Sequence, residues 1–295
     1  MRTSLDCLIC FMRQARSLGL RASDDLGMQR QLLDKAGQFI ASVNTDLAPP
    51  ENSGRLYPLL AKTLGTSDPF IQVKKESNAL ALSLREEIRQ RIAQAEDSLL
   101  AAVRAAIGGN IIDYGSLHSF DAVETMRHCF EQEFVIDDFP ALQQTISRKG
   151  QKVLYLCDNC GEIIFDGLLI EQLTQKGCEV TAVVRDAPII NDATLADAQA
   201  CGLDQLCPVI SSGTSCPGTP LSQCSPEFLA HFQAADIIIS KGMGNFESLS
   251  EVAAPIFFLF TVKCTEVARH LVEQRKLATG FLQGKGEMVL LRQQL

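Results

Sequence analysis

Short apolar runs alternate with helix-like segments through the second half of this 295-residue chain. The runs occupy residues 152–157, 179–185, 206–211, 236–240 and 256–262, and helical patterns separate them at 162–176, 192–201, 226–234 and 264–273. Strands that alternate with helices in this way are usually parallel and joined by right-handed crossovers. The pattern therefore predicts an α/β fold, with a doubly wound, mainly parallel sheet and helices on both of its faces.

The first half of the chain has helical spacing of its apolar residues instead. We predict helices at 7–18, 23–44 and 55–64 and one long amphipathic helix at 75–107, with breaks at the Pro49-Pro50 and Asp68-Pro69 pairs. The organisation that follows is a helical subdomain at 1–149 packed on an α/β domain at 150–295.

Composition narrows the class of partner. A hydrophobic content of 46% with 21% charged residues is typical of a soluble globular protein. The formal net charge of −8, with no basic stripe, argues against nucleic acid as a partner. The longest apolar run, 253–262, is too short to span a bilayer, and eleven cysteines without a signal peptide indicate a reducing cytoplasm. The sequence carries no signal for an oligomeric state.

Polar residues follow every predicted strand at its carboxyl end, where ligands gather in sheets of this kind. They lie at 158–162, 185–192, 211–214, 241–247 and Lys263. Asp158 and Asn159 offer adjacent oxygen ligands, and Asp192 offers a third, which suits Mg²⁺, Mn²⁺ and similar ions. The alternative is that Asp158 and Asn159 only cap the following helix.

A phosphate group would complement such a metal. Lys263 would contact it from another strand end, and the glycines around Gly244, with Asn245, would bring N–H groups and an amide close to the same oxygens. Glu162 would handle protons or support the ligands, although a carboxylate in the first helical turn also complements the helix dipole.

Several motifs together resemble one family, the metal-dependent damage-control phosphatases with an ARMT1-like domain, long known as domain of unknown function 89. The resemblance rests on the segments 158–162, 191–194, 241–247 and 109–113, on Lys263, and on Asp68-Pro69-Phe70. The pair Cys7 and Cys10 fits the shorter, prokaryotic branch of this family.

The resemblance implies a hydrolase for small phosphorylated metabolites, such as sugar phosphates, that prefers Mn²⁺, Co²⁺ or Ni²⁺ over Mg²⁺. It implies that Asp158, Asn159 and Asp192 bind the metal and that Lys263 contacts phosphate. Glu247, which ends the 241–247 motif, and Asp113 are predicted to face the substrate with Gly244 and Asn245. The nucleophile is either metal-activated water, which we favour, or Asp158 through an aspartyl-phosphate.

Two Cys-x-x-Cys pairs, Cys7/Cys10 and Cys157/Cys160, leave another hypothesis open. Together they would supply four thiolates to a zinc ion or cluster. The corresponding function is a non-catalytic metal- or nucleotide-binding module whose cysteine pairs sense redox state.

Overall fold

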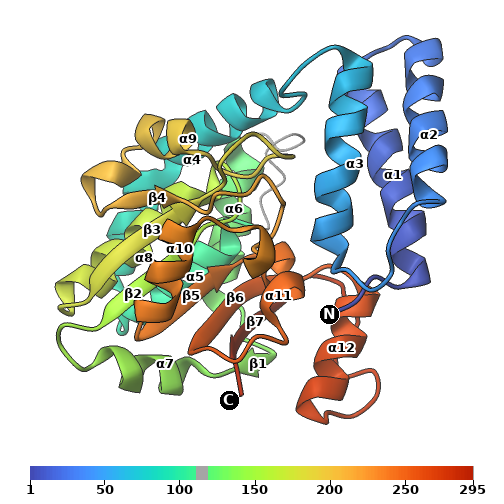
Figure 1. Cartoon of the computed structure of the whole chain (residues 1–295). Coiled ribbons are helices and arrows are strands. Elements are labelled where there is room, and N and C mark those ends of the chain that lie inside the picture. Colours follow the sequence, from blue (N-terminus) through green and yellow to red (C-terminus); the bar gives the residue numbers. More distant parts are fainter. Residues whose placement is uncertain (111–118, 295) are drawn as a thin grey trace.

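A seven-stranded sheet forms the centre of the protein in a computed structural model that describes residues 1–110 and 119–294 (Figure 1). The strands are β1 (Ile136–Asp137), β2 (Lys152–Leu156), β3 (Glu179–Val184), β4 (Val209–Ser211), β5 (Ile237–Lys241), β6 (Ile256–Val262) and β7 (Glu287–Arg292). Their order is β1-β7-β6-β5-β2-β3-β4, and the β6–β7 pair is antiparallel whereas the other neighbouring pairs are parallel. The predicted doubly wound, mainly parallel sheet is confirmed.

Helices cover both faces of this sheet. Val153 and Tyr155 of β2 belong to a core shared with α4 (Ile71–Gln94), α5 (Ser98–Gly108), α6 (Ser119–Glu131), α7 (Phe139–Ile146) and α8 (Glu162–Gln175). Leu154 and Leu156 belong to the opposite core, with α10 (Pro226–Ala234), α11 (Met243–Leu249) and α12 (Thr265–Arg275). A strand buried on both faces needs apolar side chains at every position, which explains the uninterrupted apolar runs in the sequence.

The first three helices form a separate bundle with its own core. They are α1 (Leu5–Ala22), α2 (Leu26–Ile40) and α3 (Pro49–Leu64), and Phe11, Leu32 and Leu56 are among the side chains buried between them. Figure 1 shows the bundle, in blue, beside the sheet and next to α11 and α12. The division of the chain near residue 149 stays a prediction, and α4 and α5 pack on α8 rather than in this bundle.

The prediction of one long helix at 75–107 is wrong. The chain leaves helical geometry at Ala95, and α5 begins only at Ser98. The Asp97 side chain accepts hydrogen bonds from the N–H groups of Leu99 and Leu100, each over 3.0 Å, and so caps the second helix. Helical spacing of apolar residues continues across the break and hid this capping signal.

The sequence pattern also missed the two strands at one edge of the sheet. After α12 the chain returns to the same end of β6, so that Glu287 of β7 lies opposite Val262. This short return makes β7 antiparallel, and β1 then pairs with β7.

The remaining helical elements are short. Residues 195–200 form the helix α9 (Leu195–Ala200), and two 3₁₀ turns lie at Leu203–Gln205 and Leu221–Gln223.

Replacing Asp97 with alanine should destabilise the protein by about 1 kcal/mol, because two N–H groups at the start of α5 lose their acceptor. Urea unfolding followed by circular dichroism measures the change. Glu96→Ala is the matched control, since Glu96 is an exposed neighbour outside the cap. An equal loss in both variants would contradict the capping role.

Candidate metal centre

The loops that follow β2 and β3 are hydrogen-bonded to each other at the carboxyl end of the sheet. Asn159 and Asp192 form an isolated antiparallel bridge, and the N–H of Ala193 donates to the carbonyl oxygen of Asp158 over 2.9 Å. The N–H of Cys160 donates to the carbonyl oxygen of Asn191 over 2.8 Å. The structure thus brings together the three predicted metal ligands, Asp158, Asn159 and Asp192.

One polar atom of each of these three side chains forms hydrogen bonds with other side chains of the protein. Oδ2 of Asp158 accepts from Nδ2 of Asn159 over 2.7 Å and from Nδ2 of Asn110 over 3.1 Å. Nδ2 of Asn159 also donates to Oε2 of Glu162 over 3.1 Å. Oδ2 of Asp192 accepts from Nε of Arg185 over 2.8 Å. These contacts orient the three side chains.

The other oxygen of each side chain is unused. Among the residues that the structure describes, none donates a hydrogen bond to Oδ1 of Asp158, Asn159 or Asp192. Because the amide nitrogen of Asn159 is bound by two carboxylates, its oxygen is the atom left to face a ligand. Three hard oxygens without donors fit a divalent cation with open coordination positions.

The alternative that Asp158 and Asn159 cap α8 is wrong. Gly161 is the N-cap residue of α8 and has no side chain, and the side chains of Asp158 and Asn159 hydrogen-bond to other side chains instead of to backbone N–H groups of α8. The N–H of Gly161 instead donates to Oδ1 of Asn78, a residue of α4, over 2.7 Å. A side chain from another element therefore supplies the acceptor at the start of α8.

The charges around this cluster favour a cation. Burial raises the pKa of Asp158 well above its usual range, and the neighbouring carboxylates of Asp192 and Glu162 raise it further. Burial also raises the pKa of Asp192, although Arg185 opposes that effect. Within the described ranges, no group of three or more His, Cys, Asp or Glu side chains is placed to hold a metal ion. The predicted ligand set is of a different kind, with two carboxylates and the amide of Asn159.

A buried lysine, Lys241, forms ion pairs with Glu162 and Asp166 next to the predicted metal ligands. Nζ of Lys241 donates to Oε1 of Glu162 over 2.5 Å, to Oδ1 of Asp166 over 2.7 Å and to the carbonyl oxygen of Ala106 over 2.7 Å. Burial opposes the charge on Lys241, but the two carboxylates keep its pKa above the ordinary value. The hydroxyl of Tyr155 donates to the same oxygen of Asp166 over 2.7 Å.

This arrangement bears on the role predicted for Glu162. Its Oε1 binds Lys241, and its Oε2 accepts from Asn110 over 2.9 Å and from Asn159. Both carboxylate oxygens are therefore occupied, and the side chain is fully buried. A catalytic role for Glu162 stays a prediction, and its contacts are those of a residue that positions Asn159.

Arg185 also binds and orients a predicted metal ligand, Asp192. Besides Asp192, its guanidinium binds Oδ1 of Asn245 over 2.9 Å, Oγ1 of Thr219 over 3.0 Å and the carbonyl oxygen of Gly218 over 2.8 Å. Nδ2 of Asn245 donates to the carbonyl oxygen of Lys241 over 2.8 Å. Asn245 is fully buried, so substrate binding by this residue stays a prediction.

Lys263 lies at the rim, at the end of β6. Its Nζ donates to Oδ1 of Asn110 over 2.6 Å and to the carbonyl oxygen of the same residue. Asn110 in turn donates to Asp158 and Glu162, so it connects the predicted phosphate ligand with the predicted metal ligands. The sequence indicated Asn110 only as part of the 109–113 motif. Asp113 lies outside the described residues.

A cavity of about 650 Å³ opens beside these ligands, between the rim of the sheet and the helical bundle. Asn159, Asp192, Gly244, Glu247 and Lys263 line it from the sheet side, and α1 and α3 contribute Asp6, Cys7, Cys10, Arg13, Pro49 and Pro50. The segment 242–247, which the sequence placed after a strand, lies mainly in α11. Gly244 and Glu247 line the cavity one helical turn apart.

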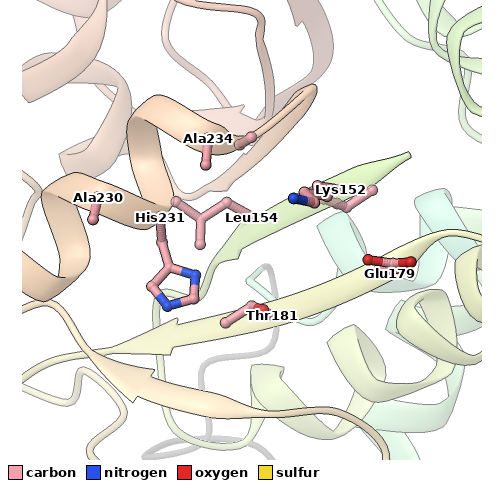
Figure 2. A pocket seen from close by; sticks show the side chains of 9 residues that line it. Lys152, Leu154, Glu179, Thr181, Ala230, His231 and Ala234 are labelled. Atoms are coloured by element: carbon pink, nitrogen blue, oxygen red, sulfur yellow. The ribbon is translucent and has the colours of Figure 1, made fainter. Parts of the chain in front are cut away.

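A second hollow lies at the opposite end of the strands. It has a volume of about 360 Å³, and Figure 2 shows Lys152, Glu179, Thr181 and His231 around it. Lys152 and Glu179 are the first residues of β2 and β3. This hollow is therefore at the amino ends of the strands, away from the ligand cluster.

The two Cys-x-x-Cys pairs have different surroundings. Cys7 and Cys10 line the cavity from α1, whereas Cys157 and Cys160 are buried behind Asp158. Burial raises the pKa of Cys157 and of Cys160 well above that of a free thiol. Buried neutral thiols pack as small apolar groups and are poor metal ligands or nucleophiles.

Together these features define the class, an α/β protein with a divalent-metal ligand set at the carboxyl ends of its strands and a small-molecule cavity beside it. The chain belongs to the damage-control phosphatase ARMT1-like domain family, whose model matches residues 3–277. The resemblance seen in the motifs is confirmed. Assignment to the branch with paired cysteines stays a prediction.

Individual relatives cover almost the whole chain. A damage-control phosphatase of Pyrococcus horikoshii is 37% identical over 92% of this chain and 94% of its own length. One from Archaeoglobus fulgidus is 30% identical over 92% and 96%. The crystal structure of a DUF89 family protein from Pyrococcus horikoshii matches with a TM-score of 0.89, at 34% identity over 100% of both chains.

Gly242 gives a test of the Asp158 position. It has a φ of 79°, and a Cβ there would overlap the Asp158 carboxylate, whereas Gly280 has a φ of 81° and open space around it. Gly280→Ala should cost about 1 kcal/mol for the backbone alone. Gly242→Ala should cost about 2 kcal/mol more and also weaken Mn²⁺ binding. Urea unfolding and equilibrium dialysis measure both, and equal effects in the two variants would contradict the close contact with Asp158.

Proposed function

We propose that the protein is a metal-dependent phosphatase that hydrolyses phosphate monoesters of small metabolites in the cavity between the sheet and the helical bundle. The observation that carries this proposal is the set of three unused oxygens of Asp158, Asn159 and Asp192. The names of the relatives, damage-control phosphatases from two archaea, support the same activity.

Asp158, Asn159 and Asp192 would hold the divalent metal. When bound there, such an ion supplies Lewis-acid charge to phosphoryl oxygens and lowers the pKa of water. Lys263 would bind phosphoryl oxygens from the adjacent rim, where Asn110 fixes its ammonium. Mn²⁺, Co²⁺ or Ni²⁺ would serve better than Mg²⁺, in keeping with the family resemblance.

The contacts of Asp158 favour water as the nucleophile. Oδ2 accepts from two amide nitrogens, and Oδ1 is the atom assigned to the metal. Attack on phosphorus by Oδ2, as an aspartyl-phosphate would require, would compete with these two hydrogen bonds.

The cavity supports a small-molecule substrate. Its volume of about 650 Å³ lies within the range of roughly 300–1,000 Å³ that is usual for such sites. In the described part of the chain, no helix is long and apolar enough to cross a membrane. A redox-sensing module has less support, because Cys7 is buried and burial raises the pKa of its thiol.

Replacing either carboxylate ligand should remove the activity. We expect Asp158→Asn and Asp192→Asn to lower kcat/KM for p-nitrophenyl phosphate in Mn²⁺ by about 100-fold or more, because each removes a negative charge from the ligand set. Equilibrium dialysis after chelation should show weaker Mn²⁺ binding, independently of turnover.

Asp204→Asn is the control, because Asp204 is an exposed carboxylate in a 3₁₀ turn away from the cavity. It should retain both properties of the wild type. If Asp158→Asn and Asp192→Asn bind Mn²⁺ and turn over as the wild type does, the assigned ligands are wrong.

A further inference from the structure

Glu247 is a buried carboxyl group that faces the cavity without a protein partner. The residue is only 9% exposed, yet it lines the same cavity as Asn159, Asp192 and Lys263. No side chain or backbone group in the described part of the chain forms a hydrogen bond or ion pair with its carboxyl oxygens. Burial of an unpartnered polar group is costly, so such a group in a cavity wall points to a partner that enters the cavity.

Burial, rather than the neighbouring charged groups, moves the pKa of Glu247 toward neutral pH. Burial raises its pKa to about 7, and the terminal ammonium of Met1 opposes this shift. Cys7, Cys10 and Arg13 line the same cavity from α1, and burial raises the pKa of the Cys7 thiol. Cys264 and Lys263 face it from the loop after β6.

Other acidic residues near the cavity are less suited to give up a proton. Both oxygens of Glu162 are occupied by Lys241 and two amides. Glu266 is paired with Arg269, and Asp6 is exposed to solvent. Asp158 and Asp192 are assigned to the metal. Glu247 is the remaining carboxyl group among the described residues of the cavity wall.

We propose that Glu247 is the general acid of the reaction, which protonates the leaving-group oxygen of the phosphate ester. This inference rests on the proposed phosphatase function and assigns a chemical role to a residue that was expected only to contact substrate. A general acid matters most for esters of alcohols, because an alkoxide is a strongly basic leaving group.

The proton balance is simple. Water adds to phosphorus, the bond between phosphorus and the ester oxygen breaks, and its electron pair stays on that oxygen. The carboxyl group of Glu247 gives its proton to this oxygen, which forms the free alcohol. The attacking water releases one proton to solvent, and solvent returns one to Glu247. One ester and one water yield one alcohol and one phosphate, with no oxidation or reduction.

A series of esters with graded leaving groups tests the role. p-Nitrophenyl, phenyl and benzyl phosphate are similar in size, but the basicity of the leaving oxygen rises in that order. We expect Glu247→Gln to lower kcat/KM for benzyl phosphate by about 100-fold or more, the usual contribution of a general acid, and to change p-nitrophenyl phosphate hydrolysis by less than about threefold. The loss for phenyl phosphate should lie between.

Glu251→Gln is the matched control, because Glu251 is an exposed carboxylate 3.6 Å from the same terminal ammonium and outside the cavity. It should leave all three rates unchanged. An equal loss for all three esters in Glu247→Gln would overturn the general-acid role, as would no loss for benzyl phosphate. A wild-type enzyme inactive toward every ester would instead overturn the phosphatase proposal itself, and the role of Glu247 with it.

The pH profile of the wild type provides a second measurement that needs no variant. The protonated carboxyl is the active form, so kcat/KM for benzyl phosphate should fall as pH rises through about 7. This decrease with rising pH should be absent for p-nitrophenyl phosphate, because its leaving group departs without needing a proton from a general acid. Identical profiles for the two esters would contradict the proposal.

Discussion

Two buried cations, Lys241 and Arg185, hold the carboxylates from which the site is built. Lys241 joins Glu162 and Asp166, and Arg185 joins Asp192 to Asn245. An isolated buried charge costs several kcal/mol, and removal of one partner of such a pair typically costs about 3–5 kcal/mol. The protein therefore keeps these groups in fixed positions, and the atoms that remain without donors are fixed with them.

The net charge of the cluster explains why it suits a metal. Four buried carboxylates, Asp158, Glu162, Asp166 and Asp192, surround the two cations, so negative charge is in excess. The raised pKa of Asp158 expresses this excess, since burial and neighbouring carboxylates both disfavour its ionised form. A divalent cation next to the unused oxygens would offset that repulsion.

Much of the fold followed from local pattern, because the buried strands and their helices repeat with clear periods. The strands β1 and β7, at one side of the sheet, did not, since their pairing depends on a chain reversal after α12 that no short motif marks. The break between α4 and α5 was hidden for a similar reason, as Asp97 interrupts the backbone but not the apolar spacing.

The site was only partly visible in the sequence. Oxygen ligands that follow strand ends could be grouped in advance, because parallel strands place those ends together. The residues that orient these ligands could not be identified from the sequence. Lys241 contacts groups 75, 79 and 135 positions away, and Asn245 is 60 positions from Arg185. A lysine at the end of an apolar run looks like an exposed residue until the fold encloses it.

The helical bundle contributes to the site in a different way from the sheet. The hydrogen-bond partners described for Asp158, Asn159 and Asp192 come from the sheet domain and from Asn110, and none comes from α1 to α3. The bundle instead supplies the far wall of the cavity, with Arg13 and Cys10 of α1. Under the proposed function, metal binding and phosphate chemistry would therefore depend on the rim of the sheet, and the choice among metabolites would depend on the bundle. Glu247 lies where the two meet, because α11 packs on α3 and also follows the end of β5. In the proposed reaction, that position would place the carboxyl group of Glu247 between a phosphate bound at the rim and a metabolite bound by the bundle.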